Sequence, residues 1–171
     1  MSELLSISII VPVYNSERNL QNCIDSLLNQ DFERPFEIIM VDDASTDNSQ
    51  NVIKKQNSPL IKLISLKSNK GPATARNEGL KIAKGEYIFF LDSDDEISKN
   101  SFKILYSAAK KNNLDLVISD KKVIDKLKNL RENTYIYEND IIFNNNEITK
   151  EIKKRLFNPL YEEGLIGITG R

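Results

Sequence analysis

Five aspartates in this 171-residue chain fall at or just after the ends of apolar runs. Crowded carboxylates repel one another unless a cation offsets their charge, and oxygen ligands of this kind suit a hard divalent ion. Such an ion keeps several waters and completes its shell with phosphate oxygens. The pattern therefore predicts a metal-assisted site for a phosphate-bearing ligand. The aspartates are Asp42, Asp43, Asp92, Asp94 and Asp95.

Three other polar side chains are expected near the same place. Tyr14 and Asn15 follow the apolar run 6–13, and Arg76 lies at the start of a predicted helix after "KGPAT". An arginine there would contact phosphates in a bidentate manner or pair with one of the aspartates; a solvated helix surface is the alternative. Each polar residue alone also suits an ordinary turn or cap, but together they favour a site.

The elements that must position these residues alternate along the first 120 residues. Apolar, β-branched runs predict strands at 6–14, 36–43, 61–66, 86–92 and 114–119, and helical spacing predicts helices between them. Strands separated by crossover helices form a parallel sheet in an α/β fold. Ligands of such sheets bind beyond the carboxyl ends of the strands, which is where the aspartates fall.

Composition narrows the function further. The chain has 24 basic and 25 acidic residues and no histidine, which excludes a nucleic-acid footprint, a Ser/His/Asp triad and imidazole metal ligands. Neither GxGxxG nor the P-loop pattern occurs. Cys23 is the single cysteine, which fits a reducing, cytoplasmic setting. No apolar run approaches the roughly 18 residues that a membrane span needs.

The carboxyl-terminal part has a weaker pattern. We expect a ligand-binding α/β core over residues 1–120 and an irregular or incomplete region of the same domain over 121–171. The latter is charged and asparagine-rich, with a short strand predicted at 134–137 and a helix at 146–157.

Three segments in this order resemble the amino-terminal half of family 2 glycosyltransferases, the inverting group with the GT-A fold. They are "ISIIVPVYNSERNLQNCIDSLLNQ", "FEIIMVDDASTDNSQNVI" and "NKGPATARNEGLKIAKGEYIFFLDSDD". The resemblance covers about residues 6–120. It implies transfer of a sugar, with inversion, from a nucleoside diphosphate donor, commonly a UDP-sugar, to an acceptor hydroxyl. It also implies a glycan or lipid-linked acceptor and peripheral association with the cytoplasmic membrane face.

The resemblance assigns roles to the residues at the first two strand ends. Pro12, Tyr14 and Asn15 of "VPVYN" would form one wall of the nucleotide pocket, with Pro12 and Tyr14 beside the base. In "VDDASTD", Asp42 would accept a hydrogen bond from the base and Asp43 would support the same loop.

The resemblance also assigns roles around the diphosphate and the sugar. Arg76 of "ARNEG" would reach the nucleotide-sugar region. In "DSDD", Asp92 would lie near the ribose and share with Asp94 the binding of Mn²⁺ or Mg²⁺, and Asp95 would lie close to the donor sugar.

The sequence differs from the family pattern in the region that would supply the catalytic base. An inverting displacement needs an acid within reach of the attacking hydroxyl, and the family supplies it from its carboxyl-terminal half. That region is abbreviated here, so a truncated chain is expected. Glu162 and Glu163 of "YEEGL" are weak candidates, and Asp140 is weaker still. Two alternatives are a nucleotide-sugar binding module without turnover and a Mg²⁺-dependent receiver or phosphoryl-transfer domain.

Overall fold

The computed structural model describes residues 4–119, 121–125, 130–134 and 166–170. The chain divides into two compact units, one of residues 1–117 and 167–171 and the other of residues 118–166. The predicted strand at 134–137 overlaps the described residues only at Thr134, which ends a strand, and the predicted helix at 146–157 lies outside them. The predicted division at residue 120 stays a prediction.

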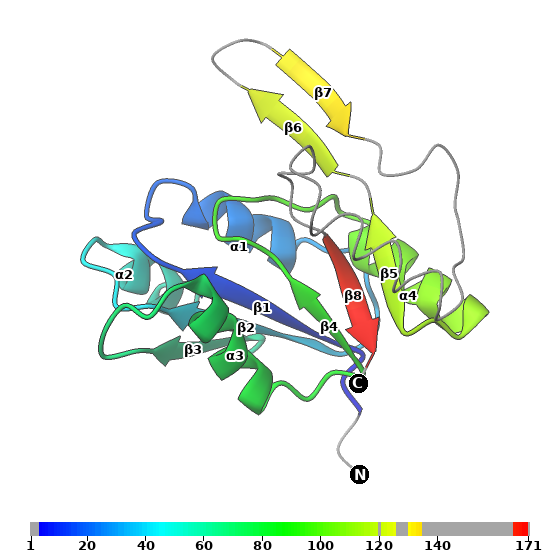
Figure 1. Ribbon diagram of the computed structural model, residues 1–171, viewed down its shortest axis with the longest axis horizontal. Helices are drawn as coiled ribbons and strands as arrows, with labels where there is room; N and C mark the ends of the chain where they lie inside the picture. Colours follow the sequence, from blue (N-terminus) through cyan, green and yellow to red (C-terminus); the bar gives the residue numbers. More distant parts are fainter. Residues whose placement is uncertain (1–3, 120, 126–129, 135–165, 171) are drawn as a thin grey trace. The chain divides into compact units, whose positions relative to one another are not determined.

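The first unit is built on a mostly parallel sheet, as the sequence predicts (Figure 1). The central strand β1 (Ile7–Val13) pairs in parallel with β2 (Phe36–Asp42) and with β4 (Tyr87–Phe90). β2 in turn pairs in parallel with β3 (Ile61–Ser65). Because these strands run the same way, the polar residues that follow β1, β2 and β4 meet at one edge of the sheet.

One strand of this sheet is not predicted from the sequence. β8 (Ile166–Gly170) pairs antiparallel with β4, so that Ile168 lies opposite Phe89. Its short "IGITG" run, with two glycines, has little periodicity to detect. The order of the sheet is β3-β2-β1-β4-β8-β5, where β5 spans Leu116–Ser119.

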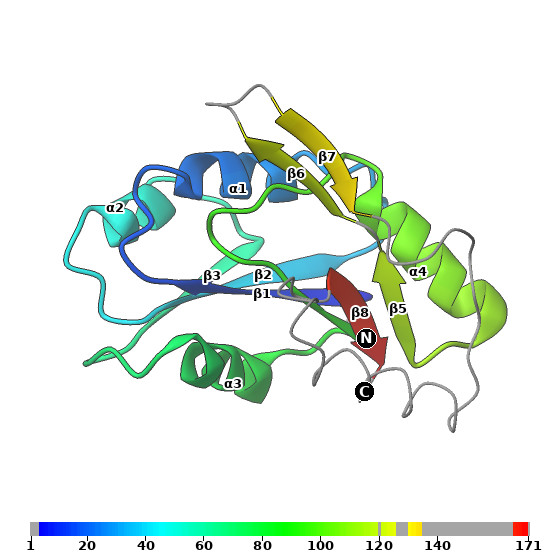
Figure 2. The same cartoon turned by 45° about the horizontal axis from the view of Figure 1, so that its top comes forward.

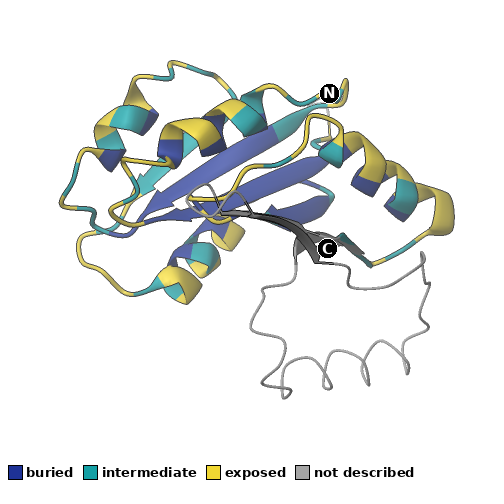
Figure 3. Ribbon diagram, turned by 90° about the horizontal axis from the view of Figure 1, so that it is seen from above, coloured by how far each residue is buried: buried dark blue, intermediate teal, exposed yellow. Residues whose placement is uncertain are grey.

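Helices cover both faces of the sheet (Figure 2). One face carries α1 (Leu20–Leu28), α2 (Ser49–Lys54) and α4 (Ser101–Asn112), and the other carries α3 (Pro72–Ile82). The strands β1, β2 and β4 are almost entirely buried and β3 is partly exposed, while the helices expose their outer sides (Figure 3). Within the described residues, no helix is long and apolar enough to cross a membrane.

Two kinds of packing fix the helices on the sheet. On the α3 face, a Cβ at Gly79 would lie 2.6 Å from Cγ2 of Ile10, so the glycine lets α3 approach β1 closely. On the opposite face, aromatic rings join the strands to α4: Phe102 lies edge-on to Phe36 and Phe89, with ring centroids 5.5 and 5.6 Å apart. Such pairs add to the stabilisation from burial alone.

The second unit contains a hairpin. β6 (Lys121–Asp125) and β7 (Leu130–Thr134) pair antiparallel, with Val123 opposite Glu132.

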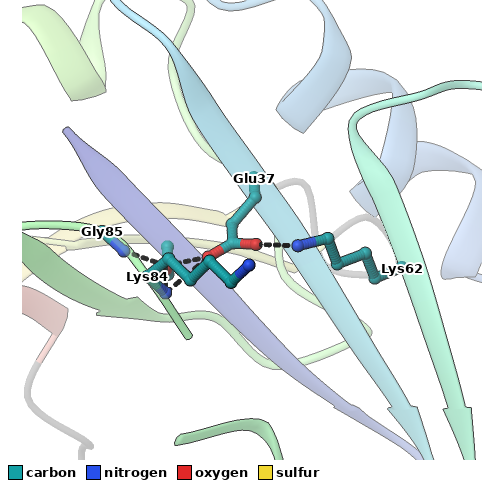
Figure 4. Close-up of polar contacts among 5 residues, drawn as sticks. Glu37, Lys62, Lys84 and Gly85 are labelled. Atoms are coloured by element: carbon teal, nitrogen blue, oxygen red, sulfur yellow. Dashed lines mark hydrogen bonds and ion pairs between the residues drawn. The ribbon is translucent and has the colours of Figure 1, made fainter. Parts of the chain in front are cut away.

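A buried carboxylate ties together the amino-terminal ends of the parallel strands (Figure 4). Glu37 of β2 is 3% exposed and pairs with Lys62 of β3. It also accepts hydrogen bonds from Ser8 of β1 at 2.6 Å and from the Lys84 N–H at 2.7 Å. The Gly85 N–H donates to Ser8 Oγ at 2.7 Å, so the segment that enters β4 joins the same network.

The network changes the acidity of Glu37. Burial alone would raise the pKa of this carboxyl, but the hydrogen bonds from Lys62, Ser8 and Lys84 outweigh burial and lower the pKa below its ordinary value of 4.5. Because the folded pKa lies below the unfolded one, ionised Glu37 stabilises the fold fully above about pH 4.5. This contribution is lost as the pH falls further, through the folded pKa.

We predict that Glu37→Gln lowers the free energy of unfolding by about 1–3 kcal/mol at pH 7, because it removes charge-assisted hydrogen bonds. The difference from the unmodified protein should shrink as the pH falls below 4.5. Urea denaturation across this pH range measures it. Glu78→Gln is the matched control, since Glu78 forms a partly exposed ion pair with Lys81 within α3 and should matter little at any pH. A Glu37→Gln deficit independent of pH would contradict this account.

Candidate functional site

The loops after β1, β2 and β4 and the start of α3 surround one cavity of about 800 Å³ at the carboxyl-terminal edge of the sheet. Polar and charged side chains predominate in its lining, as expected for a site that binds a charged ligand. The lining residues are Pro12, Val13, Tyr14, Asn15, Ser16, Glu17, Arg18, Asn19, Asp43, Thr46, Asp47, Asn69, Gly71, Pro72, Arg76, Asp92, Ser93 and Asp94.

Most of the residues singled out from the sequence therefore meet around this cavity. Asp42 and Asp95 are not among its lining residues. Glu162, Glu163 and Asp140 lie outside the described residues, so their catalytic role stays a prediction. The residues brought together are Pro12, Tyr14, Asn15, Asp43, Arg76, Asp92 and Asp94.

The segment after β1 presents an aromatic ring to the cavity. Tyr14 is 48% exposed, although it directly follows the fully buried strand β1. Pro12, two residues earlier, is buried in β1 and lines the same wall. An exposed ring beside a rigid strand offers a surface on which a planar ligand could stack.

Asn15 contacts the protein itself. Its backbone is left-handed, with φ of 49°, a conformation that asparagine tolerates better than most residues. The side-chain Oδ1 accepts a hydrogen bond from the Thr46 N–H at 2.8 Å, and the Asn15 N–H donates to Ser45 Oγ at 3.0 Å. Asn15 thereby holds the loop after β1 against the loop after β2.

Two carboxylates missed by the sequence reasoning complete this clamp. Asp47 accepts the Glu17 N–H at 3.0 Å and the Ser49 N–H at 2.9 Å, and the Glu17 carboxylate accepts the Asn48 N–H at 2.8 Å. Burial works against the charged form of Asp47, but hydrogen bonds outweigh burial and lower the pKa of this carboxyl. The Ser49 hydroxyl, which donates to Asp47 at 2.6 Å, contributes most, followed by the N–H groups of Glu17 and Ser49. The signal for Asp47 was present in "STDNS", where an acid precedes a helix.

Asp42 and Asp43 are both buried and both bind to protein groups. Asp42 accepts hydrogen bonds from the Gln50 side chain at 2.6 Å and from the Ser45 N–H at 3.3 Å. Asp43 accepts the N–H groups of Lys70 and Gly71 at 2.8 and 2.7 Å. Asp43 therefore fixes the turn that begins α3, while the role of Asp42 toward a base stays a prediction.

The acid residues after β4 differ in their partners. Asp92 forms an ion pair with Arg76 of α3, which is one of the three possibilities that the sequence leaves for that arginine. Asp94 is exposed and lines the cavity, and no hydrogen bond or ion pair of its carboxylate occurs among the described residues.

These carboxylates suit a metal ion shared with a ligand. Among the described residues, no group of three or more acidic, cysteine or histidine side chains could hold an ion alone. Mg²⁺ and Mn²⁺ accept oxygen ligands, and Mg²⁺ sites often use one or two carboxylates with water and phosphate oxygens. The donor set of Asp94 and Asp92 fits such an ion, provided that a phosphate completes its shell.

The negative charge of the acids after β4 also affects Cys23 of α1. Burial is the main cause that raises the pKa of the Cys23 thiol to about 12, followed by the negative charges of Asp95 and Asp94. Cys23 is therefore protonated and unreactive at neutral pH, as expected of a buried cysteine.

We predict that Gly71→Ala destabilises the protein by about 1–3 kcal/mol, because Gly71 has φ of 85° and ψ of 160°, a region that only glycine occupies readily. A Cβ there would meet no atom within 4 Å, so the effect comes from backbone strain alone. Urea denaturation measures it.

The reciprocal control is Ala44→Gly at the same edge of the sheet, because Ala44 already has φ of 59°. Its stability should stay unchanged or rise by up to about 1 kcal/mol. Equal losses in both variants would contradict an origin in backbone strain.

Comparison with known proteins identifies similar sequences. The glycosyl transferase family 2 profile matches residues 8–164. The poly(ribitol-phosphate) beta-glucosyltransferase of Bacillus spizizenii is 41% identical over 125 residues, which are 71% of this chain and 20% of that protein. The chain thus spans about a fifth of that relative's length.

Solved structures are similar as well. S. aureus TarS in complex with UDP-GlcNAc has 38% sequence identity and a TM-score of 0.63, over 67% of this chain and 34% of that chain. The mannosyltransferase PcManGT of Pyrobaculum calidifontis, in complex with GDP-Man and Mn²⁺, has a TM-score of 0.62 over 68% of this chain and 36% of that chain. At 24% identity, the latter shows likeness of fold alone.

Proposed function

The chain belongs to glycosyl transferase family 2, and from that premise we propose that the cavity binds the UDP part of a UDP-sugar together with a divalent cation. The expected GT-A fold, with a mostly parallel sheet flanked by helices, is confirmed. The observation that carries the proposal is the placement of an exposed aromatic ring and an exposed carboxylate, Tyr14 and Asp94, on the same cavity.

The cavity has groups for each part of such a ligand. Tyr14 and Pro12 offer the stacking surface for the base, and Asp43 holds the turn at Gly71 beside it. Asp92 and Asp94 would hold Mn²⁺ or Mg²⁺, which supplies positive charge to the diphosphate leaving group. The complex of TarS with UDP-GlcNAc supports this choice of ligand, and the oxygen donors of Asp92 and Asp94 support the choice of metal.

Two arginines in the lining add positive charge to that of the proposed cation. Arg76 pairs with Asp92, and Arg18, two residues before α1, lines the cavity and is exposed. When a diphosphate enters, the Arg76 guanidinium can donate to it while it stays beside Asp92, because a guanidinium has five N–H donors. Arg76 would in this way position the leaving group.

The proposed reaction is the transfer of the sugar to an acceptor hydroxyl with inversion at the anomeric carbon. The hydroxyl oxygen forms the new bond while the bond to the diphosphate breaks, and a carboxylate base takes the hydroxyl proton. Glu162 or Glu163 remains the proposed base. The proposed acceptor is a glycan or a lipid-linked molecule; the name of the Bacillus relative, a poly(ribitol-phosphate) glucosyltransferase, supports a hydroxyl-bearing polymer in this role. A cytoplasmic location, at the inner membrane face, completes the proposal.

We predict that the protein binds UDP at least about tenfold more tightly with Mn²⁺ than without it, and that Asp94→Asn removes most of this gain. Isothermal titration calorimetry with UDP, GDP and inorganic phosphate measures both effects. Asn keeps the shape of the side chain and removes the charge. Glu78→Gln, on the outer side of α3, is the control and should bind as the unmodified protein does.

Two results would contradict this proposal. Binding of inorganic phosphate as tight as that of UDP would favour a phosphoryl-transfer domain, and an Mn²⁺ gain unchanged in Asp94→Asn would place the metal elsewhere. Hydrolysis of a UDP-sugar by the same chain would distinguish turnover from binding alone.

A further inference from the structure

The loop after β4 is held by a row of polar groups along α1. We call residues 92–99 the acid loop. The Ser26 Oγ accepts the Ile97 N–H at 3.2 Å, the Gln30 side chain donates to the Ser98 carbonyl at 2.8 Å, and the Cys23 thiol donates to the Asp92 carbonyl at 3.7 Å. Cys23 and Ser26 lie three positions apart on one side of α1, and Gln30 follows four positions later, just beyond the end of the helix.

The row continues beyond the amino-terminal end of α1 to the cavity. Ser16 lies seven residues before Cys23, and its carbonyl accepts the Leu20 N–H at 3.0 Å, so the helical turn extends back to it. The Ser16 Oγ lies 2.6 Å from the Ser93 Oγ, a hydrogen-bond distance. Both serines line the cavity, and Ser93 is only 8% exposed.

Ser16 is also part of the wall that carries Tyr14. The Ser16 Oγ donates to the Tyr14 carbonyl at 3.2 Å, and the Ser16 N–H donates to Ser49 Oγ at 2.9 Å. Ser93, for its part, lies between Asp92 and Asp94 in the chain. A single contact between two hydroxyls therefore links the wall with the exposed ring to the loop with the carboxylates.

We propose that Ser16 and Ser93 are a positioning pair. They set the distance between the nucleoside wall, which is formed by Pro12, Tyr14 and Asn15, and the part of the acid loop that would bind the metal, which is Asp92 and Asp94. The inference rests on the proposed function, since it requires one ligand to engage both. UDP would contact the nucleoside wall and the metal ion at the same time. Because the separation is already fixed, the entropic cost of ordering the acid loop is not added to the free energy of binding. Neither serine needs to contact the ligand for this effect.

This role predicts a specific change in ligand binding. Without the hydrogen bond, the acid loop keeps its contacts with α1 and the ion pair of Asp92 with Arg76, but it loses its link to the wall that carries Tyr14. The carboxylates are then less well placed for an ion on the diphosphate. UDP without metal depends mainly on the nucleoside wall, which keeps its clamp of Asn15 and Asp47. Loss of the pair should therefore weaken the effect of the metal more than the binding of the nucleotide.

The test is calorimetric titration of the full 171-residue chain with UDP, with and without Mn²⁺, for Ser16→Ala, Ser93→Ala and the double variant. We expect each single substitution to reduce the Mn²⁺ enhancement of UDP affinity about three- to tenfold, as for loss of one hydrogen bond. Metal-free UDP affinity should change by less than about twofold by the same reasoning. The double variant should keep as much of the Mn²⁺ enhancement as the more strongly affected single variant, because each substitution removes the same hydrogen bond.

Ser58→Ala is the matched control. Its Oγ accepts the Leu60 N–H at 3.3 Å in the connection between α2 and β3, and it does not line the site cavity. It should leave both affinities unchanged. Thermal unfolding of every variant gives the effect on stability, which a merely structural role would change without changing the Mn²⁺ enhancement.

The outcomes separate this inference from the proposed function. If the unmodified protein shows no Mn²⁺ enhancement of UDP binding, the proposed function fails and the inference fails with it. If the enhancement is present and both single variants keep it within about twofold, a change smaller than loss of one hydrogen bond, the positioning pair alone is refuted. Additive losses in the double variant would show that the serines act separately and would also refute it.

Discussion

Repulsion between carboxylates is the constraint on which the site depends. Parallel strands place the acids of three loops at one edge of the sheet, where each charge needs a compensating partner. The protein supplies backbone N–H groups to Asp43 and Asp47 and a guanidinium to Asp92. Asp94 is exposed on the cavity without such a partner within the described part of the chain, and this imbalance is what a cation would correct.

At the opposite end of the sheet, a carboxylate charge is compensated entirely by protein groups. There, Glu37 is buried, and Lys62, Ser8 and a backbone N–H satisfy its oxygens fully. This network joins β1, β2 and β3 to the segment that enters β4, so the ends of the strands opposite the cavity are tied together. A rigid sheet then presents the loops at its other edge, where polar groups are available for a ligand.

Much of this could be predicted from the sequence, and the failures have physical causes. β-branched runs and crossover helices predict the parallel sheet, and their order places Tyr14, Asp43 and Asp94 at one edge. β8 is not predicted because five residues with two glycines carry no clear period. Ser93 is not predicted because its partner Ser16 lies 77 residues away, and no local pattern reveals such a hydrogen bond. The roles of Asp42 and Asp95 toward a ligand stay predictions.

The central claim is that one cavity holds a nucleotide and a metal ion together, and paramagnetic broadening of backbone amide signals by Mn²⁺ tests it most directly. With UDP present, Mn²⁺ should broaden the amide signals of residues 92–95 first, while diamagnetic Mg²⁺ with UDP should shift the signals of residues 14–18 without broadening. Broadening centred on another part of the chain, or unchanged signals for residues 14–18, would contradict the account.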